Sequence, residues 1–223
     1  MGRTSLRGVA SVEFAFIAMV LVPLLLGTGA VGINMILTLQ TIQLARDAGH
    51  MYARGLDFSQ PGNQTILANV GSTLGLSSTA GSGSAVVILS ALTYVDDAAC
   101  TAAGAVDGNG NPKGCTNLGK WVFTQRLEIG NSSVRTSSVG SPLTSGPTGV
   151  TVNSTTGRIS LSDYVTKAGA VATFSSINPY SSVNGNVSGL PSGQVLYVAE
   201  AAATAFSMPP FIGPPATYSF GLF

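Results

Sequence analysis

The chain has 223 residues, and only 9% of them are charged, with ten Lys and Arg against nine Asp and Glu. This is about a third of the charge of an average soluble domain, and the near-neutral balance excludes the basic face of a nucleic-acid-binding protein. One histidine, His50, and two cysteines are too few for a His-rich metal site or an ordinary nucleophile–base centre. We therefore expect no enzyme, no cofactor and no nucleic-acid partner.

A long apolar segment lies near the N-terminus. Residues 14–45 contain no charged side chain, and residues 14–39 are almost entirely apolar. About 20 apolar residues cross a bilayer core, so this segment is long enough for a membrane helix. Arg3 and Arg7 precede it, and the positive-inside rule then predicts a cytoplasmic N-terminus and an exported remainder.

A cleaved signal peptide is the alternative interpretation of this segment. Such a peptide has an apolar region of about 7–15 residues that ends in a small-residue cleavage site. Here the apolar region is longer, and residues 42–53 continue as a helical pattern without a proline or a cluster of turn residues. The sequence favours an anchor that is retained.

The junction before the helix places Gly8 five residues before Glu13. An acidic residue at the centre of a membrane helix costs about 3 kcal/mol on insertion scales, so one at the edge needs water or a positive partner. One explanation is a hydrated Glu13 in the headgroup layer. The other is a cut after Gly8, which would give Val9 a new α-amino group on the same helix face as Glu13.

This arrangement resembles the leader of type IV prepilins, and more closely that of the TadE-like pseudopilins of the tight-adherence (Tad) system. In these proteins a short basic leader ends in Gly, a Glu stands five residues later, and an apolar helix follows. The resemblance covers about residues 3–58. The matching residues are Arg7, Gly8, Glu13 and Phe14, the apolar run with Pro23, and the Ala/Arg/Gly-rich segments 45–49 and 52–55.

The resemblance implies a leader over residues 1–8, a hydrophobic helix over 9–55 and an extracytoplasmic head over 56–223. It implies cleavage between Gly8 and Val9 by a prepilin peptidase, and pairing of the new Val9 amine with Glu13 during assembly. The implied partners are that peptidase, other pilins or copies of this chain, the inner-membrane assembly platform and membrane lipid. The implied location is the bacterial inner membrane with the head outside the cytoplasm, or an extracellular filament.

Helix-breaking residues lie in the middle of the apolar segment. Pro23 is followed by Gly27, Gly29 and Gly32. Neighbouring membrane helices can satisfy the backbone groups that such residues free, and small residues let helices approach closely. The pattern fits either a kinked single anchor or a helix that melts locally and packs against copies of itself.

Beyond the membrane segment, the helical pattern continues as one apolar stripe. Its members are Leu37, Leu44, Ala48 and Met51. We expect the stripe to pack on the head or on a neighbouring subunit, with packing on the head the more common outcome. A helix over residues 10–54 would be about 65 Å long and would project from the membrane as a stalk. We expect His50 to be an ordinary solvated residue on this stalk.

The head is rich in Gly, Ser, Thr and Asn and has strand-like segments. We expect an α+β fold in which a mainly antiparallel sheet packs on the emerging helix. A short helix is expected over 63–72, and the Ala-rich part of 194–206 could be helical instead of extended. The expected strands are 85–95, 120–129, 194–206 and 216–223, with weaker ones at 150–152, 158–161 and 170–174.

Cys100 and Cys115 enclose fourteen residues that are almost all turn formers. Outside the cytoplasm such a pair is most simply a disulfide, worth about 3 kcal/mol in the chain-entropy model. Free thiols or a redox pair are the alternative, but the C-x-x-C motif is absent. We expect a structural disulfide.

Inside that loop, three oxygen-bearing side chains have the one-three-five spacing of a calcium loop. They are Asp107, Asn109 and Asn111. The match then fails, because Pro112 and Leu118 stand where a glycine and a bidentate glutamate belong. A solvated turn is the favoured interpretation, and a calcium site is a weak alternative.

Two further features of the head carry no firm assignment. Four Asn-x-Ser/Thr triplets begin at Asn63, Asn131, Asn153 and Asn186, in agreement with an exported surface. Residues 206–223 form a Pro- and aromatic-rich end, which could cover the head or contact a neighbouring subunit.

The sequence therefore predicts a membrane-anchored, pilin-like protein that works by assembly. It is a minor pilin or pseudopilin, the main subunit of an extracellular filament, or a singly anchored exported binding module.

Overall fold

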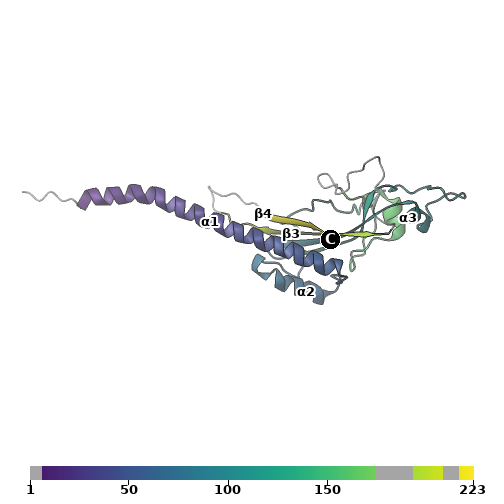
Figure 1. Cartoon of the computed structure of the whole chain (residues 1–223), viewed down its shortest axis with the longest axis horizontal. Helices are drawn as coiled ribbons and strands as arrows, with labels where there is room; N and C mark the ends of the chain where they lie inside the picture. Colours follow the sequence, from purple (N-terminus) through teal and green to yellow (C-terminus); the bar gives the residue numbers. More distant parts are fainter. Residues whose placement is uncertain (1–6, 174–192, 208–215) are drawn as a thin grey trace, which may run out of the picture.

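The computed structural model describes residues 7–173, 193–207 and 216–223. One helix, α1, runs without a break from Arg7 to Ala53 and leaves the rest of the molecule as a long rod (Figure 1). The remainder folds into a head of four strands with short helices around them. The α+β expectation is confirmed.

The four strands form one antiparallel sheet in the order β2-β1-β3-β4. The four main strands predicted from the sequence are therefore all present, including the edge strand at the C-terminus. Their bounds are Ala85–Tyr94 for β1, Trp121–Gly130 for β2, Val195–Thr204 for β3 and Ala216–Leu222 for β4.

Helix α1 packs its second half against one face of this sheet. Leu44, Ala45 and Ala48 are buried there against alternate residues of β1 and β3. The stripe that contains Leu44 and Ala48 thus packs on the head, as expected, with Leu37 and Met51 at its margins.

The Ala-rich centre of β3 is a strand, not a helix. Ala199, Ala201 and Ala203 point to the α1 face and are buried. Because successive strand residues alternate between faces, these small side chains form a flat strip on which the helix can lie close. Tertiary packing thus overrides the helical preference of alanine.

Short helices surround the sheet. The predicted helix near residue 63 is present as α2, Pro61–Val70, and a 3₁₀ turn follows at Ser72–Leu74. Two short helices were not predicted from the sequence, namely α3, Asp97–Ala102, and α4, Leu161–Thr166. Both have an N-terminal capping side chain, since Asp96 accepts from the Ala99 N–H and Ser160 from the Asp163 N–H.

The three weaker strands were predicted wrongly. Residues 150–152, 158–161 and 170–174 contribute only isolated bridges, such as Val152 with Ile159 and Val122 with Val171. Each segment has too few extended residues for a ladder, and residue 174 lies outside the described residues. The second and third segments lie along the outer edge of β2, where the Ile159 N–H donates to Thr124 O and the Ala172 N–H donates to Trp121 O, each at 2.9 Å.

Some sequence-based expectations lie outside the described residues. These are the leader residues 1–6, Asn186 and the Pro-rich part of the C-terminal segment, residues 209–215. The described part of that segment, β4, is paired with β3 and packs against α1.

Candidate functional site

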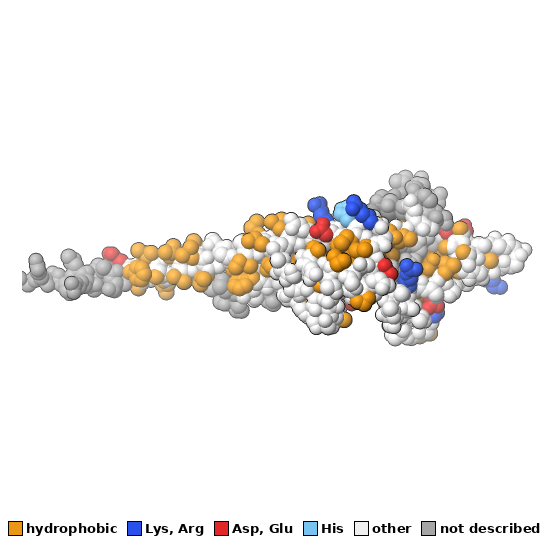
Figure 2. Space-filling model, turned by 90° about the horizontal axis from the view of Figure 1, so that it is seen from below, with side chains coloured by type: hydrophobic (Ala, Val, Ile, Leu, Met, Phe, Trp, Pro, Cys, Tyr) orange, Lys and Arg blue, Asp and Glu red, His pale blue; other side chains and the backbone are white. Residues whose placement is uncertain are grey.

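Helix α1 divides into two parts by exposure. Residues 12–29, the free segment, touch little of the head, and their large side chains are exposed, from 49% at Leu21 to 73% at Met19. Residues 30–53, the docked segment, begin at Ala30, which is buried. In the space-filling view the free segment is a thin rod with hydrophobic side chains along it, whereas charged groups gather on the head (Figure 2).

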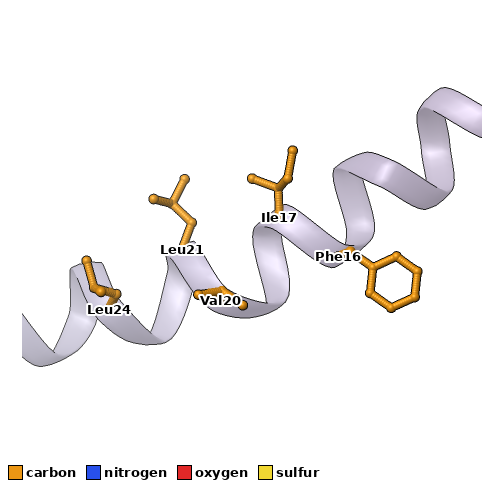
Figure 3. A pocket seen from close by; sticks show the side chains of 5 residues that line it. All are labelled: Phe16, Ile17, Val20, Leu21 and Leu24. Atoms are coloured by element: carbon orange, nitrogen blue, oxygen red, sulfur yellow. The ribbon is translucent and has the colours of Figure 1, made fainter.

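The free segment is apolar on all sides. Five of its side chains border a shallow depression on the helix surface, and all leave from this one helix (Figure 3). They are Phe16, Ile17, Val20, Leu21 and Leu24. A helix that is hydrophobic all round needs lipid or other helices around it. Among the described residues, α1 is the single helix long and apolar enough to cross a membrane.

The predicted processing site lies in the first turns of α1. The helix already includes Gly8 and Val9, and the side chain of Glu13 is exposed. Residues 9 and 13 therefore occupy consecutive turns of one continuous helix, one above the other. This spacing is compatible with the predicted charge pair, which stays a prediction.

The helix-breaking residues do not interrupt α1. Pro23 lies inside the helix. A Cβ atom added at Gly27, Gly29 or Gly32 would meet nothing within 4 Å. These positions therefore leave open surface on which another helix could pack closely.

Polar contacts fasten the docked segment to the β3–β4 hairpin. The Asn34 side chain donates from Nδ2 to Phe206 O at 3.1 Å and accepts the Phe206 N–H on Oδ1 at 2.9 Å. Seven residues further, the Thr41 and Thr217 hydroxyls are 2.8 Å apart and buried. Because both pairs are two turns apart on α1, they fix the hairpin along the helix axis.

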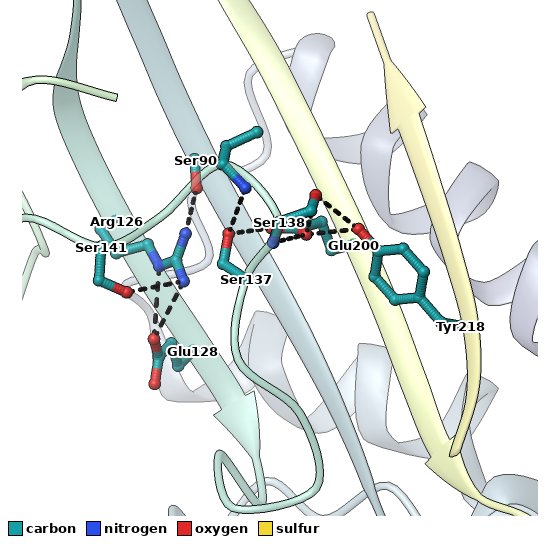
Figure 4. Close-up of polar contacts among 9 residues, drawn as sticks. Ser90, Arg126, Glu128, Ser137, Ser138, Ser141, Glu200 and Tyr218 are labelled. Carbon is teal, nitrogen blue, oxygen red and sulfur yellow. Dashed lines mark hydrogen bonds and ion pairs between the residues drawn. The ribbon is translucent and has the colours of Figure 1, made fainter. Parts of the chain in front are cut away.

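On the sheet face opposite α1, several polar groups donate hydrogen bonds to one buried carboxylate (Figure 4). Glu200 is 1% exposed and accepts from the Ser138 N–H at 2.7 Å and from the Tyr218 hydroxyl at 2.6 Å. The Ser137 and Ser138 hydroxyls also donate to it. Burial and the Glu200 bond raise the pKa of Tyr218, which keeps its proton for donation.

Arg126 extends this cluster across β2. Its guanidinium donates to Ser90 Oγ at 2.8 Å and pairs with Glu128 at 3.2 Å. Burial lowers the pKa of Arg126, while the charges of Glu128 and Glu200 oppose that shift. Arg126 also donates to Ser141 Oγ at 3.3 Å, so the arginine and Glu200 together fasten the segment 137–141 to the sheet, a structural role that the sequence did not indicate.

The disulfide prediction is confirmed. Cys100 and Cys115 are bonded, with their Cα atoms 5.7 Å apart. Within the loop, Asp107 Oδ1 accepts the N–H groups of Asn109 and Asn111, each at 2.9 Å. These amides hold the pKa of Asp107 below its usual value. The carboxylate thus closes its own turn, and the described residues contain no cluster of three or more His, Cys, Asp and Glu side chains that could hold a metal.

His50 is exposed, as expected, but it has an aromatic neighbour. The Phe223 ring meets it edge-on with the centroids 4.8 Å apart. Phe223 also covers Gly49, where an added Cβ would lie 2.0 Å from its ring. The C-terminal residue is therefore packed on α1.

The contact between Asn34 and Phe206 was not predicted from the sequence, in which Asn34 is one of the few polar residues of the apolar segment. An amide in a helix without nearby charges was the available signal, because such a group needs a partner when it is not in water. Its partner lies 172 positions away. A single sequence does not reveal a contact at that separation.

Comparison with known proteins agrees with the geometry of α1. Residues 8–50 match the TadE-like protein family. The resemblance to TadE-like proteins is thus confirmed over this segment, which includes Gly8, Glu13 and both parts of α1. No curated protein and no solved structure matches the chain. The TadE-like match ends before the sheet, so the head is described by its own structure alone.

Proposed function

We propose that this chain is a pilin-like assembly protein, a minor pilin or pseudopilin of a Tad-type IV pilus, processed between Gly8 and Val9. The observation that carries the proposal is the free segment of α1, a bare apolar rod with Glu13 near its start, inside the TadE-like match. A helix of this kind is costly in water and is stable in lipid or among other helices.

The proposed assembly step is electrostatic. Cleavage would remove Arg3 and Arg7 and leave a positive amine on Val9, one helical turn before Glu13. The amine of one subunit and the carboxylate of another, or of the same subunit, would then neutralise each other in an apolar setting. Opposite charges attract much more strongly there than in water.

The head would remain outside the cytoplasm, where the Cys100–Cys115 disulfide would cross-link one of its loops. Its proposed partners are the prepilin peptidase, other pilins, the inner-membrane assembly platform and membrane lipid. The open surface at Gly27, Gly29 and Gly32 favours a second candidate, in which copies of this chain form the main body of an extracellular filament.

Complementation of a deletion strain of the native host tests the proposal. The gene is restored as wild type, as Glu13→Gln or as the matched control Asp47→Asn, which neutralises an exposed acid on the same helix. We expect wild type and D47N to restore surface pili, and E13Q to insert in the membrane without restoring them. Normal piliation by E13Q would refute the charge-pairing step.

The composition of purified pili separates the two candidates. Trace amounts of this chain in pili made of another protein support the minor pilin. Filaments in which this chain is the main component support the second candidate. Complete independence of piliation from this gene would leave a singly anchored exported binding module.

A further inference from the structure

The free segment of α1 is shorter than the bilayer it would cross. Its uncharged part, from Phe14 to Gly29, measures about 24 Å at 1.5 Å per residue, whereas the hydrocarbon core is about 30 Å thick. With Glu13 at the cytoplasmic boundary of the core, the opposite boundary falls beyond the point where the head begins. The first part of the head along α1 must then lie at the membrane surface.

Asn34 marks that level. It lies about 31 Å from Glu13 along the helix axis. Phe206 is hydrogen-bonded to the Asn34 side chain through both its N–H and its carbonyl, so it lies close to the level of Asn34 along α1. Its side chain is 42% exposed although it is a large aromatic group at the end of the hairpin.

The surrounding sequence fits an apolar boundary. Asp, Glu, Lys and Arg are absent from residues 201–223, which include the end of β3 and the start of β4, and from residues 58–95, which include the start of β1. Ala85 pairs with Ala203, so these ends meet at the same edge of the head. Burial of this edge near acyl chains would therefore bury no charged side chain of these two segments. Arg135, from the loop after β2, lies 3.9 Å from the Tyr218 ring centroid on the sheet face opposite α1, and its exposed guanidinium can face the lipid headgroups.

We propose that Phe206 inserts into the boundary between lipid headgroups and acyl chains, and that Asn34 holds it there, so that the head rests on the bilayer surface. The inference rests on the proposed anchoring of the chain by α1. Aromatic side chains at this depth are typical interfacial anchors. The partner is a lipid bilayer, and the contact would set the height and orientation of the head before the subunit leaves the membrane.

Depth-dependent quenching of tryptophan fluorescence tests this placement. The full chain is reconstituted in phosphatidylcholine vesicles that carry a nitroxide either on the headgroup or near the end of the acyl chain. Because Trp121 is the single tryptophan, Trp121→Phe gives a background in which Phe206→Trp or Leu24→Trp is the only emitter. L24W reports the free segment, where Leu24 is 58% exposed.

We expect W121F/F206W to lose most of its emission to the headgroup nitroxide and little to the chain-end nitroxide. W121F/L24W should show the reverse order. Wild type should resist both, because Trp121 pairs with Tyr94 at the far end of β1 from Ala85. Retention of the Cys100–Cys115 disulfide and of the wild-type circular dichroism spectrum confirms that each variant is folded.

Quenching of L24W without quenching of F206W would overturn the inference and leave the anchor intact. Stronger quenching of F206W by the chain-end nitroxide would overturn it too, because the residue would lie deep in the core. Loss of quenching at both positions would refute the anchor and, with it, this inference.

Discussion

The two parts of helix α1 differ in how their apolar side chains are arranged. The free segment exposes large residues on every side, whereas the docked segment buries one face, including Ala45 and Ala48, against the head. Its other face keeps large apolar side chains exposed as far as Leu39, and charged ones begin at Arg46. An apolar surface that goes all round a helix needs a surrounding apolar phase, while a one-sided stripe needs one partner surface. One continuous helix thus contains both a membrane-type and a globular-type element, and burial of one of its faces begins at Ala30.

Truncation of one leucine in each part should give the largest contrast. Leu44→Ala removes a side chain that is 2% exposed, and we expect it to lower the free energy of unfolding of the head by about 2–5 kcal/mol. Leu25→Ala, at a position 59% exposed, should change it by less than about 0.5 kcal/mol. Denaturant titration in detergent, followed by Trp121 fluorescence, measures both. Equal effects would contradict the division of α1.

Added methyl groups on two glycines test the same division. Gly49→Ala places a Cβ against the Phe223 ring, whereas Gly29→Ala meets nothing within 4 Å. We expect the free energy of unfolding of G49A to be about 1–3 kcal/mol lower than that of G29A. The added methyl group overpacks the docked surface in G49A, whereas the free surface in G29A has room for it. The NMR signals of the His50 ring should also shift in G49A alone, since Phe223 contacts that ring. Unchanged His50 signals would show that the C-terminus is not docked.

Loss of the Asn34 amide should have a smaller, local effect. In Asn34→Leu the Phe206 N–H loses its acceptor, and a hydrogen bond worth about 1 kcal/mol corresponds to about fivefold faster amide exchange. Hydrogen exchange at Phe206 measures it. Thr28→Val is the control, because the Thr28 hydroxyl donates only within the helix, to Leu25 O. Equal amide exchange rates at Phe206 in N34L and wild type would contradict the hydrogen bond between Asn34 and Phe206.

Local sequence patterns predicted the elements that depend on local chemistry. The strands at 85–94 and 121–130 have runs of β-branched and aromatic residues, and the long helix has an uninterrupted apolar pattern. The disulfide followed from the expected export of the head and from the two available cysteines. In each case the signal lies within a short stretch of chain.

Contacts between distant residues could not be predicted in this way. The carboxylate of Glu200 depends on serines more than 60 positions earlier, and Asn34 depends on Phe206. The predicted long helix is confirmed, but the sequence did not show that contact with the head begins at Ala30, ahead of the predicted stripe that starts at Leu37. The small helices α3 and α4 were missed although capping residues Asp96 and Ser160 preceded them, because six residues are too few for a periodic pattern.

The N-terminus of the mature chain tests the central claim most directly. Intact-mass analysis of the protein from membranes of the native host, with and without its prepilin peptidase, reads that terminus. We predict a chain that begins at Val9 when the peptidase is present and one that keeps residues 1–8 when it is absent. A chain that keeps Arg3 and Arg7 in both strains would contradict the proposed pilin-type processing.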